Sequence, residues 1–93
     1  MTDARRCVMV RIIGQVQGVG FRDWTVRQAL GLGLEGWVSN HQDGSVQAVV
    51  AGTDEAVSAM LEAFLKGPEL ATVTDVMWHQ TKDAGLSGFR IVP

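Results

Sequence analysis

The chain has 93 residues, enough for one compact domain with a single hydrophobic core. It is 46% hydrophobic and 19% charged, a composition typical of folded proteins rather than disordered ones. Eight Lys and Arg against ten Asp and Glu give a formal net charge of −2, which argues against a broadly basic nucleic-acid binder but leaves room for one concentrated anion site.

The first third of the chain predicts a strand, a Gly-rich loop and a helix. Alternating β-branched residues favour a strand over residues 7–13. Three glycines in the next seven residues, 14–20, indicate a loop with unusual backbone angles. A switch to helical periodicity then predicts a helix from Phe21 to about Gly33. Its apolar positions are Trp24, Val26, Ala29 and Leu30, and we expect Trp24 and Leu30 to share the inward face of the helix.

The rest of the chain predicts a hairpin, a second helix and two more strands. Asp43-Gly44 is a hairpin signal between extended segments at 34–40 and 46–51. Thr53 is placed to cap a helix that Gly67-Pro68 ends. The apolar stripe of this helix, predicted to lie in the core, is Val57, Met60, Leu61, Phe64 and Leu65. With strands at 73–80 and 89–92, the order is βαββαβ plus a terminal strand, which predicts an α+β fold with two helices on one face of a mostly antiparallel sheet.

Composition argues against several classes of protein. One Cys and two His are too few for a structural zinc site, and we expect Cys7 to be a small buried hydrophobe. No apolar run approaches the roughly 20 residues that span a bilayer, and the polar start, residues 1–6, does not resemble a secretory leader. We therefore expect a cytoplasmic protein with one domain, residues 1–93. The basic side chains near the start are expected to be solvated: Arg5, Arg6 and Arg11.

The Gly-rich segment and Arg22 together favour an anion site. Glycines let successive N–H groups turn inward as an anion-binding nest, and a helix start adds unpaired donors and partial positive charge. Arg22 in the first helical turn is placed to reach back over the loop, where its planar guanidinium matches two phosphate oxygens. Asp23 is not expected to pair with it, because adjacent helical residues do not face each other. On spacing alone, a plain strand–helix connection with a surface arginine explains these residues equally well.

Three segments resemble the acylphosphatase family, in order and over essentially the whole chain. Residues 14–22, Gly-Gln-Val-Gln-Gly-Val-Gly-Phe-Arg, closely resemble its signature Gly-x-Val-Gln-Gly-Val-x-Phe-Arg. Residues 36–40, Gly-Trp-Val-Ser-Asn, resemble its second signature, Gly-x-Val-x-Asn, and residues 85–91 resemble its usual ending. The resemblance implies a ferredoxin-like α+β sandwich.

The same resemblance implies an acylphosphatase, a hydrolase of small-molecule acyl phosphates that needs no metal or other cofactor. Arg22 would bind the phosphoryl group and Asn40 would hold the attacking water. The backbone amides expected to cradle the phosphate oxygens are those of Gln15, Val16, Gln17, Gly18, Val19 and Gly20. On its own, an Asn before a hairpin is more often a turn residue, and His41 after it is expected to be solvated. We expect a monomer with no nucleic-acid or membrane partner.

Two other functions remain as alternatives. The same cradle would serve a module that binds phosphate without turnover, and the ferredoxin-like topology also occurs in RNA binders. We expect a free enzyme rather than an embedded module, because the sequence stops directly after its last predicted strand. No Lys or Arg directly adjoins Trp24, Trp37 or Trp78, so we expect these side chains to pack in the core or at its edge rather than stack on bases.

Overall fold

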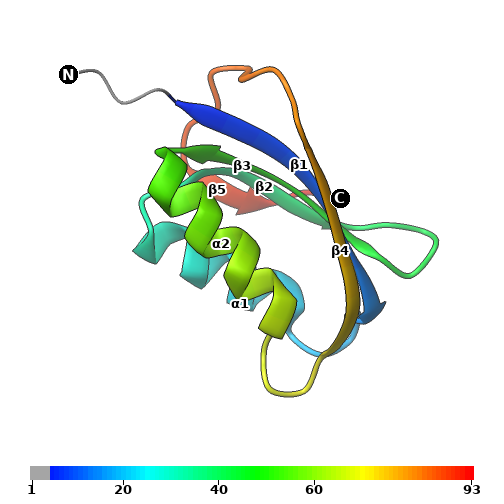
Figure 1. The fold of residues 1–93 in the computed structure, drawn as a ribbon. Helices are drawn as coiled ribbons and strands as arrows, with labels where there is room; N and C mark the ends of the chain where they lie inside the picture. Colours follow the sequence, from blue (N-terminus) through cyan, green and yellow to red (C-terminus); the bar gives the residue numbers. More distant parts are fainter. Residues whose placement is uncertain (1–4) are drawn as a thin grey trace.

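The computed structural model describes residues 5–93, so most of the polar start, residues 1–6, lies outside the described part. Figure 1 shows one sheet with both helices on the same face. The strands lie in the order β4-β1-β3-β2-β5, and every neighbouring pair is antiparallel except β2 and β5. This arrangement confirms the predicted ferredoxin-like α+β sandwich. The elements are β1 (Arg6–Gln15), α1 (Phe21–Gly31), β2 (Glu35–Asn40), β3 (Val46–Gly52), α2 (Asp54–Lys66), β4 (Thr72–Gln80) and β5 (Phe89–Ile91).

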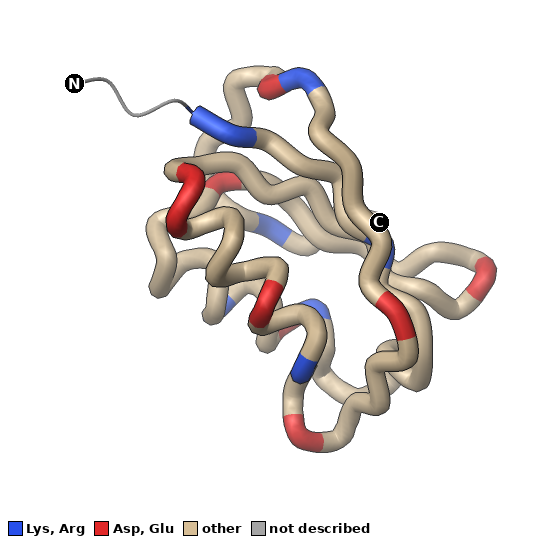
Figure 2. Tube along the Cα trace, viewed as in Figure 1, with Lys and Arg blue, Asp and Glu red and all other residues tan. Residues whose placement is uncertain are grey.

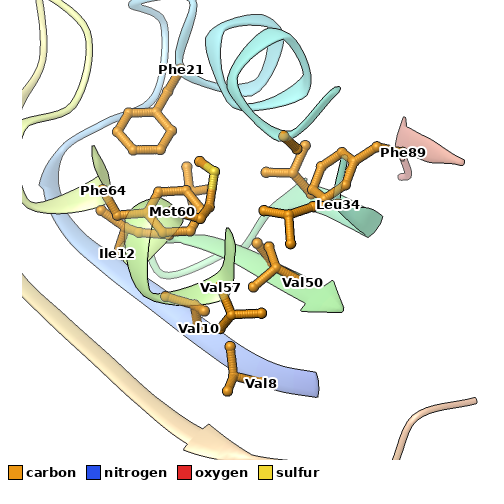
Figure 3. Close-up of a cluster of buried hydrophobic side chains, with 14 of the residues drawn as sticks. Val8, Val10, Ile12, Phe21, Leu34, Val50, Val57, Met60, Phe64 and Phe89 are labelled. Carbon is orange, nitrogen blue, oxygen red and sulfur yellow. The ribbon is translucent and has the colours of Figure 1, made fainter. Parts of the chain in front are cut away.

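The main core lies between the sheet and the two helices, as Figure 3 shows. Alternate residues of β1, namely Val8, Val10 and Ile12, point into it, as the alternating pattern predicted. The helix α2 begins as expected, with Thr53 Oγ1 accepting a hydrogen bond from the Ala56 amide at 3.1 Å. The residues that α2 buries are Val57, Met60 and Phe64.

Two apolar positions predicted to lie in the core are wrong. Leu65 at the end of α2 is 61% exposed and Leu30 in α1 is 58% exposed. In α1 the buried positions are Phe21, Thr25 and Ala29, because the four-residue spacing from the buried Phe21 sets which side of the helix faces the sheet. Thr25 satisfies its hydroxyl inside the helix by donating to the Phe21 carbonyl at 2.8 Å.

The first strand is longer than the sequence predicted. It continues through Gly14 and Gln15, which pair with Val73 and Thr72 of β4 after a register shift at Ile13. Gly14 makes this possible because its φ is 136° and a Cβ there would lie 2.1 Å from the Thr72 carbonyl oxygen. The Gly-rich loop is therefore shorter than predicted and covers residues 16–20.

The β1–α1 connection and the end of β2, which are distant in sequence, lie at the same end of the sheet (Figure 1). The end of β1 leads into the loop, α1 starts there, and β2 ends there before the turn to β3. No helix within residues 5–93 is both long and apolar enough to cross a membrane.

Gly36 in β2, the strand that ends at Asn40, provides a test of this packing. Its φ is 145°, and a Cβ there would lie 1.8 Å from the Val49 carbonyl oxygen of the neighbouring strand. We expect Gly36→Ala to lower the free energy of unfolding by about 2 kcal/mol or more, measured by urea denaturation. Gly31→Ala is the matched control, because its φ is not positive and no atom lies within 4 Å, so it should change stability by less than about 1 kcal/mol. Equal midpoints for the two variants would contradict the tight β2–β3 contact.

Candidate active site

The loop between β1 and α1 is held at both ends by buried side chains. Val16 is 1% exposed and Phe21 is 2% exposed, while Val19 packs against the main core from between them. Four residues, 17–20, thus connect two anchored points over the end of the sheet. These buried apolar side chains hold the loop backbone in place and leave its N–H groups free of contacts with the core.

Two glycines shape the loop backbone. Gly18 has φ 74° and Gly20 has φ 78°, so left-handed residues alternate with ordinary ones. Within the described residues, the first amide of this region with a hydrogen-bond partner is that of Trp24, which donates to the Gly20 carbonyl at 3.0 Å. The amides of residues 16–23 have no partner in that part of the chain. A run of unpaired N–H groups at a helix start provides donors for a bound anion.

Phe21 sets the direction in which Arg22 lies. The Phe21 ring points into the core, where it stacks on Phe64 at 6.1 Å between centroids and meets Trp24 edge-on at 5.2 Å. Since successive helical residues point about 100° apart, the next side chain is directed outward. Arg22 is exposed and lines a cavity of about 250 Å3, and it forms no ion pair with Asp23 or any other residue from 5 to 93.

Asn40 is the last residue of β2 and pairs with Val46 of β3. It lines the same cavity as Arg22. Its side-chain oxygen Oδ1 is buried and accepts no hydrogen bond from any described residue. A buried acceptor without a partner destabilises the folded state by about 1–3 kcal/mol, so folding alone does not explain why this oxygen is buried.

The structure brings together most of the residues that the sequence predicted for the site. Five of them line the cavity: Val16, Gly18, Gly20, Arg22 and Asn40. Gln15 lies outside it, in the β1–β4 ladder opposite Thr72. Gln17 and Val19 also lie outside the lining, and the Gln17 side chain instead reaches the turn between β2 and β3.

Three lining residues were missed as site residues in the sequence: Phe21, Asp23 and Ile91. Ile91 reaches the site because β5 adds to β2 in parallel, with Val38 opposite Ile91. Residues 85–91 resemble the usual ending of the acylphosphatase family, but sequence spacing alone does not place the last strand beside the strand that bears Asn40.

Other predicted roles are mostly confirmed. Cys7 is buried at 5% exposure, and burial raises the pKa of its thiol, which makes it a poor nucleophile. Trp24 packs on the core and Trp37 on the small second cluster around Cys7. Trp78 is 46% exposed, and Arg6 lies over its ring at 5.0 Å.

Arg5 is exposed, as expected, but the basic start also forms ion pairs at the surface that the sequence did not predict. Arg6 Nη1 lies 2.9 Å from Asp54 Oδ1, and Arg5 pairs with Glu35 and Asp83. These contacts line a larger cavity of about 620 Å3 near the first residues of β1 and the start of α2, which contains none of the predicted site residues. Within residues 5–93, no group of three or more His, Cys, Asp or Glu side chains is placed to hold a metal ion.

The turn after Asn40 is held by Asp43. Asp43 Oδ1 accepts hydrogen bonds from the Ser45 hydroxyl at 2.6 Å and the Ser45 amide at 2.9 Å, and Oδ2 lies 3.0 Å from Arg11 Nη1. The Ser45 donors, together with the nearby His41 imidazole, lower the pKa of Asp43 to about 2. His41 is exposed, as predicted.

Comparison with known proteins agrees with this geometry. The family model for acylphosphatase matches residues 8–91. An acylphosphatase of Rhizobium meliloti is 55% identical over 92 residues, which cover 98% of this chain and 97% of the relative. The structure of an acylphosphatase from Coxiella burnetii superimposes with a TM-score of 0.92 at 34% identity and covers 95% of this chain and 93% of that one. For acylphosphatase from Bacillus subtilis the TM-score is 0.91 at 32% identity, with 97% and 100% covered.

These matches agree with the class that the fold and the site define, a ferredoxin-like α+β protein whose loop before the first helix has amides with no partner among the described residues. The chain belongs to the acylphosphatase family.

The low pKa of Asp43 predicts a pH dependence of stability. The folded pKa, about 2, lies below the ordinary value of about 3.9, so the ionised carboxylate stabilises the fold above about pH 4. This contribution falls as the pH drops towards 2, where the carboxylate of the folded protein is protonated. We expect Asp43→Asn to be less stable than the parent protein at pH 7 and the difference to shrink below pH 3, measured by urea unfolding across pH. A difference that stays constant from pH 7 to pH 2 would contradict the ionised turn.

Proposed function

We propose that this chain hydrolyses acyl phosphates to a carboxylate and inorganic phosphate at the loop of residues 16–20. Membership of the acylphosphatase family supports the activity. One observation carries the location of the site. Loop residues with unpaired amides, Arg22 and Asn40 all line a single cavity, and the buried Asn40 Oδ1 has no partner among the described residues.

The proposed role of the loop and Arg22 is to hold the phosphoryl group. The amides of residues 16–20 and the start of α1 supply partial positive charge from several directions. Arg22 adds a full charge and two parallel donors, and it has no acidic partner within residues 5–93 to compete for it. Charge that develops on the phosphoryl oxygens in the transition state is then met by donors already in place.

The proposed role of Asn40 is to hold the attacking water. Asn40 lines the cavity and its Oδ1 has no hydrogen-bond partner among the described residues, so in the proposal this oxygen accepts a hydrogen bond from the water and orients the water oxygen towards phosphorus. The water oxygen forms the new P–O bond while the bond to the acyl oxygen breaks and its electron pair leaves with the carboxylate. One proton of the water passes to a phosphate oxygen, and the other stays on the oxygen that is now bound to phosphorus.

This reaction needs few catalytic side chains. The leaving carboxylate belongs to an acid of pKa about 4, so it departs without a general acid. Positioning and charge stabilisation therefore supply most of the rate enhancement. The proposal also includes a small-molecule substrate, a monomeric state, a cytoplasmic location and the lack of a nucleic-acid partner. The interspersed acidic and basic residues in Figure 2 support the last of these.

Arg22→Gln provides the first test of the site. It keeps a polar side chain but removes the charge, so we expect kcat/KM for benzoyl phosphate to fall at least a hundredfold. Arg27→Gln is the matched control, an exposed arginine of α1 outside the cavity, and should leave the rate within about twofold. Equal losses in both variants, or none in either, would place the phosphoryl site elsewhere. Phosphate binding without hydrolysis by the parent protein would favour the non-catalytic module.

Asn40→Ala separates water positioning from phosphate binding. We expect kcat to fall at least tenfold, while the inhibition constant of inorganic phosphate stays within about threefold, because Arg22 and the loop amides are unchanged. The measurement is steady-state hydrolysis of benzoyl phosphate with inorganic phosphate as inhibitor. A parallel loss of turnover and phosphate affinity would contradict the water-holding role.

A chelator tests whether the site needs a metal. We expect the rate with acetyl or benzoyl phosphate to be unchanged after exhaustive dialysis against EDTA, because the loop amides and Arg22 provide the positive charge. Loss of activity that returns on adding a divalent cation would contradict the proposed mechanism.

A further inference from the structure

The side chain of Gln17 joins the phosphate loop to the turn after Asn40. Its single amide nitrogen, Nε2, donates to the His41 carbonyl oxygen at 2.8 Å and to the Ser45 carbonyl oxygen at 2.9 Å. A primary amide has two N–H donors, so both are used in this bridge. Both distances lie within the range of well-formed hydrogen bonds.

The two carbonyls belong to the opposite sides of the turn. His41 follows Asn40, and Ser45 precedes Val46, the residue paired with Asn40 in the β2–β3 ladder. The His41 amide already donates to the Ser45 carbonyl at 2.9 Å, and the Gly44 amide donates to the His41 carbonyl at 3.1 Å. Gln17 uses the second acceptor site of each oxygen and so holds the closed end of the hairpin from outside.

This bridge connects two parts of the site that the backbone does not connect locally. The phosphate cradle lies between β1 and α1, whereas Asn40 lies at the end of β2, more than twenty residues later. The core fixes the loop through Val16 and Phe21, but it does not contact the turn at His41, which is exposed. In the described residues, Gln17 is the side chain of the loop that bonds to this turn.

From this geometry we infer that Gln17 is a positioning residue that sets the distance and direction of the Asn40 amide relative to the bound phosphoryl group. The inference rests on the proposed function, in which Asn40 holds the attacking water. It assigns the Gln17 side chain a task separate from that of its backbone amide. A shift of about 1 Å between water and phosphorus costs on the order of a hundredfold in rate, so a two-bond bridge has a large effect on turnover.

The test uses Gln17→Met, which keeps the length of the side chain, adds no charge and removes both donors. The matched control is Gln42→Met, because Gln42 is an exposed amide in the same turn and forms no side-chain hydrogen bond within residues 5–93. We expect Gln17→Met to lower kcat at least tenfold and to change the inhibition constant of inorganic phosphate less than threefold. Gln42→Met should change neither by more than twofold.

A double-mutant cycle with Asn40→Ala shows whether Gln17 acts through Asn40. In the Asn40→Ala background, Gln17→Met should change kcat less than twofold, because the group that it positions is gone. Equal losses in both backgrounds would overturn the inference, and so would a loss of phosphate affinity as large as the loss of kcat. An unchanged kcat in Asn40→Ala alone would instead refute the water-holding role in the proposed function.

A measurement without substrate tests the bridge itself. Backbone amide hydrogen exchange at His41 and Gly44, followed by NMR, should become at least threefold faster in Gln17→Met and stay unchanged in Gln42→Met. Gln17 is exposed, so the urea midpoint should remain close to that of the parent protein in both variants. Unchanged exchange at both amides in Gln17→Met would overturn the inference even if kcat fell.

Discussion

The site depends on the burial of two apolar side chains, one at each end of a short loop. Val16 and Phe21 are almost fully buried, and Val19 between them packs against the same core. With Gly18 and Gly20 in the left-handed region, the backbone turns while its N–H groups stay unpaired within the described residues. Leaving donors unpaired is unfavourable for folding, and the packing of the anchors offsets that cost. A rigid set of donors results, with no reorganisation needed when an anion binds.

The same constraint explains how a chain with a net charge of −2 offers an anion site. Peptide N–H groups and the dipole of α1 act over a few ångströms, so they do not depend on the overall charge. Among residues 5–93, Arg22 is the only positively charged residue in the cavity lining. Asp23 lines it too, but it makes no ion pair with Arg22, so the guanidinium is left for a ligand.

Local signals predicted most of the fold, and together with the family resemblance they predicted five of the eight residues that line the candidate cavity. Some signals depend only on residues that are close in the chain. The structure confirms three of them: the alternation in β1, the cap at Thr53 and the helix end at Gly67. Gly14 was assigned to a loop because its role depends on the approach of Thr72, which is distant in the chain. Leu30 and Leu65 have helical spacing, but only tertiary packing decides which edge of an apolar stripe is covered. The place of Ile91 and the bridge from Gln17 likewise depend on contacts between distant segments.

A mechanism with few side chains depends strongly on their relative placement. Arg22 is fixed by the stacking of its neighbour Phe21 on Phe64, whereas Asn40 is fixed by the last rung of the β2–β3 ladder. These two supports share no local backbone, and a turn at the end of a hairpin opens more easily than a core strand. In the proposed mechanism, a fluctuation of that turn moves the water relative to phosphorus while the loop of residues 16–20 stays in place. The two hydrogen bonds from Gln17 to the turn oppose this motion, and we therefore expect a loop side chain that does not contact the reacting atoms to affect turnover.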